Sequence, residues 1–293
     1  MSTLTNLIQI VAPDLDEEPE DIFACAPGLI FTDDLRTHHG DPGSTIIYKS
    51  KRFGDIELRT ADPEVEDERR LFAQYLWNAG IKMVELISDE TANDGSWSVM
   101  GERVLELGAG VGLCGIVATL AGAEEVVMTD YPAPVVLANL RANAHNAVPN
   151  YLVSRYRVEA HEWGDVSSVL AVDFAHKSSR IIAADCYWMP DQHLCLVQSM
   201  RHFLTLGPEG RIFAISGFHT GRAKLAAFFD VAVEEGLDVE EIYEEDAEGN
   251  RRVWQKQRGG KGEDHTERNK WLVIARLKRR ISRCEPPAFA FAQ

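Results

Sequence analysis

Hydrophobic and polar positions along the chain predict alternating strands and helices. The apolar run from Val104 to Leu107 is typical of a buried strand, and apolar residues recur at helical spacing between Leu113 and Leu120. A second apolar run ends at Asp130. Residues 103–131 therefore predict a strand, a turn, a helix and a second strand, which is the repeating unit of α/β proteins with a parallel sheet.

The same pattern extends to both sides of this unit. Upstream, we expect a β-hairpin from residues 45–48 and 56–60, followed by a helix over 64–88 that Asp62 and Pro63 begin. Downstream, the pattern predicts helices at about 131–147, 191–206 and 223–235, strands at 155–160, 181–185 and 211–216, and a closing hairpin of 237–243 and 270–277. Residues 244–269 are charged and glycine-rich, which predicts a flexible loop or a substrate lip.

The turn after the first strand of the unit carries Gly108, Gly110 and Gly112. Glycine lets the backbone lie directly against a ligand, and nucleotide-like ligands bind above such strand ends. A dinucleotide fingerprint needs a further glycine where this chain has Leu113, so that match is incomplete. Glu106 precedes the turn, and Asp130 lies at the distance from which a carboxylate reaches ribose hydroxyls.

Composition limits the class of protein. A length of 293 residues with 45% apolar residues and no Gly/Ser-rich or Pro-rich linker favours one large domain. No apolar run approaches the roughly 20 residues of a membrane helix, and the start lacks the pattern of a secretory signal. Five scattered cysteines without a CxxC pair indicate neither a disulfide framework nor a metal site, so we expect a cytoplasmic location.

Charge bears on the partners of the protein. A net charge of −16 disfavours binding to nucleic acid and is compatible with a basic protein partner or with solubility alone. Acidic residues dominate the first part of the chain, so we expect an irregular arm over 1–45 with one anchored patch at 22–31. A domain over 46–277 follows, with its hairpin and helix in 46–100 and a ligand-binding core in 101–277, and then a basic tail over 278–293. The oligomeric state does not follow from the sequence.

The segment Glu106-Leu-Gly-Ala-Gly-Val-Gly112, followed by Asp130, resembles motif I and the next acidic motif of class I S-adenosylmethionine-dependent methyltransferases. With Tyr75-Leu-Trp-Asn-Ala-Gly80, Thr129-Asp-Tyr-Pro132, Asn139 and Asn143, residues 20 to 277 resemble one branch of that class. The branch contains the fungal nicotinamide N-methyltransferase-like proteins and the lysine and N-terminal methyltransferases of elongation factors. The resemblance implies an α/β fold: a doubly wound, seven-stranded Rossmann-like sheet with an antiparallel last strand, preceded by a β-hairpin and a helix.

The resemblance also implies the cofactor S-adenosylmethionine, which leaves as S-adenosylhomocysteine. The positions that match cofactor-binding residues of the family are Trp77, Glu106, Gly108, Ala109, Gly110, Asp130, Tyr131, Trp163 and Ala184. In the family, the first tryptophan lies beside the methionine end of the cofactor and the second packs on the adenine ring. From the residues alone, Trp77 could equally be a core residue and Trp163 a loop anchor.

The segment Asp185-Cys-Tyr-Trp188 occupies the position from which the family approaches the methyl group. A carboxylate at Asp185 can accept hydrogen bonds from an amine, while Tyr187 and Trp188 could present π faces to a cation. Alternatively, Asp185 caps the following helix and the aromatic rings pack in the core. Related protein methyltransferases commonly show Asp-x-x-Tyr or Asp-x-x-Phe, from which this chain departs. His219 matches a histidine of the elongation-factor enzymes and is a candidate base.

We therefore expect an N-methyltransferase that acts on a protein amine, either a lysine or an N-terminus. A lysine must first lose its proton, which costs about 4 to 5 kcal/mol at neutral pH. One alternative acceptor is a small nitrogen-containing metabolite. Another alternative is a non-catalytic partner protein with this fold, but the intact Glu106, Gly108, Gly110 and Asp130 argue against it.

Overall fold

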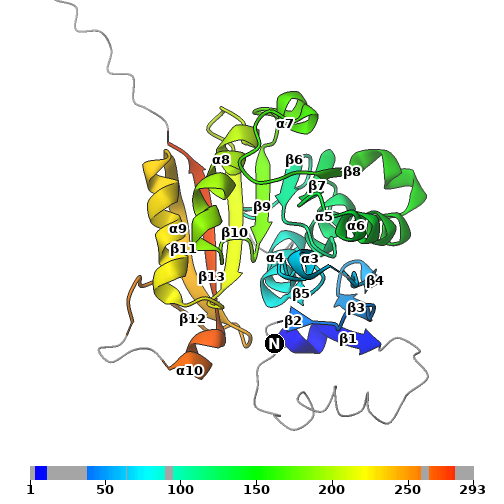
Figure 1. Ribbon diagram of the computed structural model, residues 1–293, viewed down its shortest axis with the longest axis horizontal. Coiled ribbons are helices and arrows are strands. Elements are labelled where there is room, and N and C mark those ends of the chain that lie inside the picture. Colours follow the sequence, from blue (N-terminus) through cyan, green and yellow to red (C-terminus); the bar gives the residue numbers. More distant parts are fainter. Residues whose placement is uncertain (1–3, 12–37, 64, 90–94, 259–263, 281–293) are drawn as a thin grey trace, which may run out of the picture.

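The inner strands of the central sheet have side chains that are buried on both faces. The computed structural model describes residues 4–11, 38–63, 65–89, 95–258 and 264–280. Within them the strand order is β12-β11-β13-β10-β9-β6-β7-β8 (Figure 1). In that order the bounds are Arg251–Val253, Leu237–Asp246, Trp271–Arg279, Arg211–Gly217, Arg180–Ala184, Arg103–Leu107, Glu125–Asp130 and Tyr156–Ala160. Strands β8, β7, β6, β9 and β10 are parallel, whereas β13 is antiparallel to β10 and β11.

Helices cover both faces of this sheet. One hydrophobic cluster joins a sheet face to α4 (Asn78–Ser88), α5 (Leu113–Leu120) and α6 (Pro134–Ala147). The other joins the opposite face to α7 (Val169–Phe174), α8 (His193–Phe203) and α9 (Arg222–Glu234). Figure 1 shows α8 and α9 on one side of the sheet and α5 and α6 on the other. The predicted doubly wound fold with an antiparallel last strand is thereby confirmed.

The sheet differs from the prediction at the edge formed by β12. Seven strands are those expected, and β12 is an eighth strand in the described part of the chain. Residues 244–269 are therefore not simply a loop: β11 continues to Asp246, β12 pairs with it, and α10 (His265–Asn269) precedes β13. Arg252 lies over the Trp271 ring and pairs with Glu244, so local side-chain contacts hold this extension. Lys278 and Arg279 belong to β13 rather than to a separate tail.

A small second sheet precedes the core. The predicted hairpin is present as β3 (Thr45–Ser50) and β4 (Gly54–Arg59), which pair antiparallel. Strand β1 (Ile8–Val11), which follows the short helix η1 (Leu4–Leu7), adds a third strand that the prediction of an irregular arm missed. The expected anchored patch at 22–31 lies outside the described residues.

The helix predicted over 64–88 is present only in its second part, because α4 does not cover residues 64–77. Residues 66–69 form one turn, α3 (Glu66–Arg69), and α4 begins only at Asn78. Between them Phe72 adopts a φ of 53°, and β5 (Leu76–Trp77) pairs with β2 (His38–His39). Asp62 is not the cap, because Val65 occupies that position without a side-chain hydrogen bond. Pairing with residues distant in sequence therefore overrides the helical spacing.

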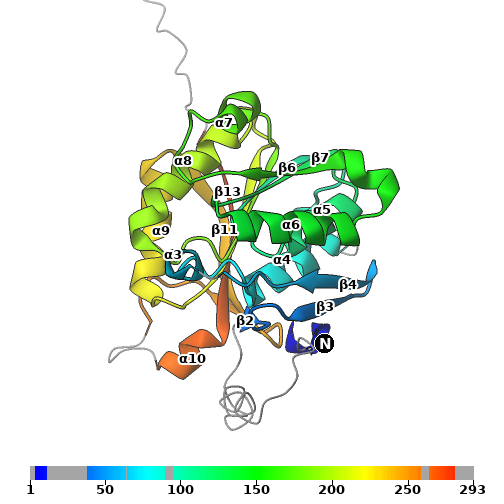
Figure 2. The ribbon, with the colours of Figure 1, turned by 45° about the vertical axis from the view of Figure 1, so that its right-hand side comes forward.

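Two asparagines of α6 tie the small sheet to the core. The buried Asn143 side chain accepts from the Arg59 amide at 2.8 Å and donates to the Arg59 carbonyl at 2.8 Å. The same side chain donates to the Val111 carbonyl in the glycine turn at 3.0 Å. Asn139 donates to the Arg59 carbonyl at 2.8 Å. Figure 2 shows β4 alongside α6, where these bonds form.

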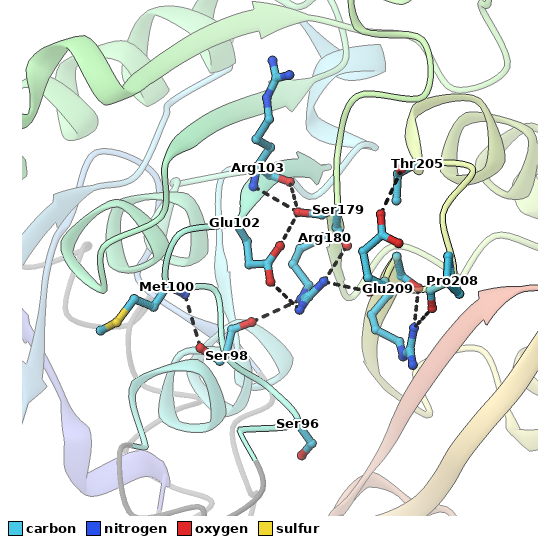
Figure 3. Close-up of polar contacts among 12 residues, drawn as sticks. Ser96, Ser98, Met100, Glu102, Arg103, Ser179, Arg180, Thr205, Pro208 and Glu209 are labelled. Atoms are coloured by element: carbon cyan, nitrogen blue, oxygen red, sulfur yellow. Dashed lines mark hydrogen bonds and ion pairs between the residues drawn. The ribbon is translucent and has the colours of Figure 1, made fainter.

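The starts of β6 and β9 are fixed by a polar network (Figure 3). The Arg180 guanidinium binds Glu102 at 2.7 Å and also donates to the carbonyls of Ser98 and Glu209. Ser179 accepts from the Arg103 amide at 3.1 Å. The two adjacent strands are thus held in register at the end opposite to their carboxyl termini. Two short 3-10 helices, η2 (Asn150–Arg155) and η3 (Pro190–Gln192), precede β8 and α8. No helix in the described residues has the length and apolar character needed to cross a membrane.

Candidate active site

A cavity of about 340 Å³ lies where β6, β7, β8 and β9 end. The predicted site residues that line it are Trp77, Glu106, Gly108, Ala109, Gly110, Asp130, Tyr131, Trp163, Ala184, Asp185 and Trp188. The structure thus brings together the glycine turn, the carboxylates and most of the aromatic side chains. Two predicted residues, Tyr187 and His219, do not line this cavity.

The glycine turn provides a wall made of backbone. Gly108 has a φ of +67°, and a Cβ built there would lie 2.8 Å from Cys186 Sγ. Gly110 has a φ of +55°, and its Cβ would lie 3.0 Å from the Ala73 carbonyl oxygen. A side chain at either position would strain the backbone and displace a neighbour. The backbone itself can therefore approach a ligand at this point.

Asp130 ends β7 and organises the turn. Its Oδ2 accepts a hydrogen bond from the Gly110 amide at 2.7 Å, and Oδ1 accepts from the Tyr131 amide at 2.7 Å. Burial raises the pKa of the carboxyl to about 6, although these two bonds act to lower it. The carboxylate has remaining acceptor capacity beside the cavity, where it can receive hydroxyl donors.

Glu106 is buried beneath the same turn. Its Oε2 accepts from the Gly115 amide at 2.9 Å, and a Cβ at Gly115 would lie 2.7 Å from that oxygen. Burial raises the pKa of Glu106 to about 8, against the lowering effect of the Gly115 hydrogen bond. A cationic ligand group in the cavity would favour the ionised form, because an opposite charge nearby lowers a carboxyl pKa.

The raised pKa predicts how stability depends on pH. The unfolded chain releases the Glu106 proton near 4.5, whereas the folded chain holds it to about 8. The free energy of unfolding of the ligand-free protein should therefore fall between these values, by up to about 1.4 kcal/mol per pH unit from this group. Urea unfolding from pH 5 to 9 measures this. In Glu106→Gln the decline should be shallower, and parallel curves for both proteins would contradict the assignment.

Two tryptophans flank the cavity at different points. Trp77 donates from Nε1 to the Phe72 carbonyl at 3.1 Å, and its ring centroid lies 4.7 Å from that of His219. Trp163 lies beside the turn, 3.3 Å from the Cβ that Gly108 lacks. Both rings therefore border the cavity and are not merely core or loop-anchoring residues.

Asp185 follows β9 and has an unusual backbone and environment. Its φ is +58°, a conformation that aspartate tolerates better than most residues. Oδ1 accepts from the Ser216 hydroxyl at 2.7 Å, the Gly217 amide at 3.0 Å and His219 Nε2 at 3.0 Å. Oδ2 is buried and has no hydrogen-bond partner. A positive φ with an unsatisfied buried oxygen is typical of a functional site.

The charges of Asp185 and His219 are coupled. Burial acts to raise the pKa of Asp185, but the charge and hydrogen bond of His219, with the Gly217 and Ser216 bonds, lower it overall. Burial acts to lower the pKa of His219, but Asp185 raises it overall. Gly217 makes room for the imidazole, because a Cβ there would lie 2.8 Å from the ring. The carboxylate is thus ionised beside a readily protonated histidine.

Tyr187 lies in the core, and the expectation that its ring faces the transferred group is wrong. The ring is fully buried and stacks on Phe228 with centroids 4.4 Å apart. His193 accompanies it there, bonded to the Tyr187 carbonyl at 2.9 Å. Trp188 does line the cavity, and Phe72 meets it edge to face.

Several lining residues were missed by sequence reasoning. Cys186 donates from Sγ to the Leu107 carbonyl at 2.9 Å and supports the glycine turn. His161 also lines the cavity, where burial lowers its pKa to about 4 and keeps it neutral. The segment from Leu71 to Tyr75 lines it as well, because the chain there is not helical. The only available signal was that Cys186 and His161 directly follow predicted strands.

Fold and site together define an S-adenosylmethionine-dependent methyltransferase. Among solved structures, the fold is similar to that of SMU.776, described as a methyltransferase complexed with SAH. The TM-score is 0.52 and the identity 10%, with 82% of this chain and 57% of that chain covered. A family model described as lysine methyltransferase matches residues 63–232. The chain therefore belongs to the lysine methyltransferase family, and the predicted cofactor is confirmed.

Several fungal proteins are similar to this chain. It is 31% identical over 183 residues to the protein N-terminal and lysine N-methyltransferase efm7 of Schizosaccharomyces pombe, covering 60% of this chain and 68% of that protein. It is 32% identical over 217 residues to the protein N-terminal and lysine N-methyltransferase EFM7 of Yarrowia lipolytica, covering 67% and 74%. The similarity thus spans about two thirds to three quarters of each relative.

The lining residues fit the cofactor of this family. The cavity offers a backbone cradle at Gly108 and Gly110 and a carboxylate acceptor at Asp130 for ribose hydroxyls. Glu106 offers a buried carboxyl that a positive charge would ionise. Trp163 offers an aromatic surface for a flat ring.

Proposed function

We propose that this protein transfers methyl groups to an amine of a protein, with Asp185 as the residue that receives the amine. The observation that carries the proposal is the buried, unpartnered Oδ2 of Asp185 at the edge of the cofactor cavity. An amine N–H is a donor that would satisfy this oxygen. The names of the fungal relatives support a lysine or N-terminal acceptor, and the net charge of −16 supports a basic partner.

The chemistry requires a neutral nitrogen held in line with the methyl group. Bound S-adenosylmethionine supplies a methyl group on a positively charged sulfur, so neither a metal nor a covalent enzyme intermediate is needed. Asp185 would orient the amine through Oδ2, while Trp77 and Trp188 would border the reacting atoms. His219 is hydrogen-bonded to Asp185, and its side chain is 20% exposed, so it connects the site with solvent for the departing proton.

We assign the other predicted site residues to binding of the cofactor. Glu106, Gly108, Ala109, Gly110, Asp130, Tyr131, Trp163 and Ala184 would hold S-adenosylmethionine, since all of them line the cavity. The described cysteines Cys114, Cys186 and Cys195 are free thiols, which supports a reducing, cytoplasmic location.

A transfer assay with radiolabelled S-adenosylmethionine tests the acceptor class. We expect a labelled band when the enzyme is offered whole-cell protein, and no label in a protein-free metabolite extract. Label confined to the small-molecule fraction would replace the protein acceptor with a metabolite amine. Cofactor binding measured by calorimetry, together with no label in either fraction, would support a non-catalytic role.

A further inference from the structure

We infer that Thr220 and Arg222 are positioning residues for methyl transfer, because they hold the loop between β10 and α9 (residues 218–221) against the acceptor side of the site. This inference rests on the proposed role of Asp185 and adds two residues that support that role from outside the cavity. Neither Thr220 nor Arg222 lines the cofactor cavity. Each therefore acts through the residues that it contacts.

The β10–α9 loop meets the acceptor side at two points. His219 Nε2 lies 3.0 Å from Asp185 Oδ1, and the Thr220 hydroxyl donates to the Trp188 carbonyl at 2.8 Å. Gly217, directly before the loop, donates its amide to the same Asp185 oxygen at 3.0 Å. A shift of the loop would therefore move the partner of Asp185 and release the backbone of Trp188, whose side chain lines the cofactor cavity.

Phe218 anchors the loop in the core. Its side chain is buried and stacks on Trp254, with ring centroids 6.2 Å apart, and the Arg222 guanidinium lies 4.2 Å from the centroid of the Phe218 ring. The backbone of the loop makes one turn, in which the Gly221 amide donates to the Phe218 carbonyl at 3.1 Å. Such a short irregular segment depends on packing from outside it, and Trp254 directly follows β12.

Arg222 attaches the loop to the extension formed by the end of β11 and by β12 (residues 244–258). It is the first residue of α9, its side chain is 7% exposed, and it binds the two carboxylate oxygens of Glu244 at 2.6 and 3.0 Å. It also donates to the Gln255 carbonyl at 2.9 Å. A guanidinium that binds both oxygens of a carboxylate has a fixed orientation, so the start of α9 and the loop before it are held to the sheet.

Glu244 keeps other partners when Arg222 is replaced. Arg252 binds its Oε2 at 2.6 Å, and Arg258 lies 3.5 Å from its Oε1. The loss of Arg222 therefore does not leave the buried carboxylate uncompensated, which would be the more costly change. We expect Arg222→Met to loosen the loop in a protein that still folds.

Two substitutions of Thr220 separate the role of its hydroxyl from that of its shape. Thr220→Val keeps the volume and loses the donor to Trp188, whereas Thr220→Ser keeps the donor. At saturating S-adenosylmethionine, the initial rate of radiolabel transfer to whole-cell protein should fall about fivefold in Thr220→Val and stay within about twofold in Thr220→Ser, because small displacements of aligned groups lower the rate. Thr205→Val is the matched control, since its hydroxyl donates to Glu209 away from the cavity, and its rate should stay within about twofold.

Substitutions at Arg222 and Glu244 test the ion pair behind the loop. Arg222→Met should lower the same rate about tenfold. Glu244→Gln should also lower it, and the double variant should lose less than the product of the two single losses, because both changes weaken one contact. Arg201→Met is the control, because it removes an ion pair with Glu235 at 3.2 Å near the ends of α8 and α9, and its rate should stay within about twofold. The Kd for S-adenosylmethionine should stay within about twofold in every variant, since none of these residues lines the cofactor cavity.

Hydrogen exchange measured by mass spectrometry tests the loop without turnover. Thr220→Val and Arg222→Met should speed amide exchange in residues 217–221, and Thr205→Val should not. Unchanged exchange, or undiminished transfer by either loop variant, would overturn the inference. A loss of S-adenosylmethionine affinity as large as the loss of rate would also overturn it, by placing the effect at the cofactor. Label only on small amines would overturn the protein acceptor, and the variants would then be compared on that amine.

Discussion

Asp185→Asn should lower kcat/KM by at least about a hundredfold while leaving the Kd for S-adenosylmethionine within about twofold. Asparagine tolerates the φ of +58° and can still accept from Ser216 and Gly217 through its carbonyl oxygen. It removes the negative charge that we propose receives the amine and that raises the pKa of His219. Turnover should therefore fail in a protein that folds and binds its cofactor.

Two further variants sharpen this result. Asp185→Ala should also remove turnover, with an added loss of stability, since it strains a left-handed position and leaves Ser216 and Gly217 without their acceptor. His219→Gln keeps a donor to Asp185 but cannot carry a proton to solvent, so the pH dependence of kcat should change. Radiometric kinetics and calorimetry measure the two quantities separately. Undiminished methylation by Asp185→Asn would show that the acceptor site lies elsewhere.

Asp130→Ala should weaken S-adenosylmethionine binding by about a hundredfold. The substitution removes the carboxylate proposed to accept from the ribose hydroxyls. The same carboxylate accepts from the Gly110 and Tyr131 amides at 2.7 Å, so these two amides also lose their acceptor. Each hydrogen bond to a charged group contributes about 1.5 to 3 kcal/mol, so the loss of one or two suffices for this change. Isothermal titration with S-adenosylmethionine and its product gives the Kd directly.

A matched variant controls for a general loss of acidic charge. Asp165→Ala removes a half-buried carboxylate that accepts hydrogen bonds from Ser167 and Ser168 near Trp163 without lining the cavity. Its cofactor affinity should stay within about twofold. An Asp130→Ala protein with unchanged Kd and reduced kcat would instead make Asp130 a residue of the acceptor side.

The sequence predicted the repeating part of the fold because that part depends on local patterns. The glycine turn, Asp130 and the strands of the parallel sheet follow from apolar runs and turn residues that lie within about 30 residues of each other. The segment from Phe72 to Trp77 could not be predicted, because its conformation depends on pairing with His38 and His39. Strand β1 likewise forms only because β3 offers an edge more than thirty residues away.

Site prediction failed where one backbone angle decides the directions of side chains. The positive φ of Asp185 turns the chain so that Cys186 supports the glycine turn and Trp188 lines the cavity. Tyr187, between them, enters the core against Phe228. Residue type favoured Tyr187 as a functional residue and gave no reason to choose Cys186, but the structure shows that Cys186 lines the cavity and Tyr187 does not.

The hydrogen bonds of Asn143 determine where this protein can be divided. The Asn143 side chain bonds to the backbone amide and the backbone carbonyl of Arg59, as a neighbouring strand would. It also donates to the carbonyl of Val111 in the glycine turn. A fragment that lacked the first 60 residues would leave the buried Asn143 Oδ1 without its donor and would remove one of the two acceptors of Nδ2, next to the glycine turn. We therefore expect the N-terminal strands to be required for cofactor binding. We therefore expect truncation limits and fusion sites to be tolerated before η1 or after β13, and not at the boundary near residue 100 that the order of elements suggests.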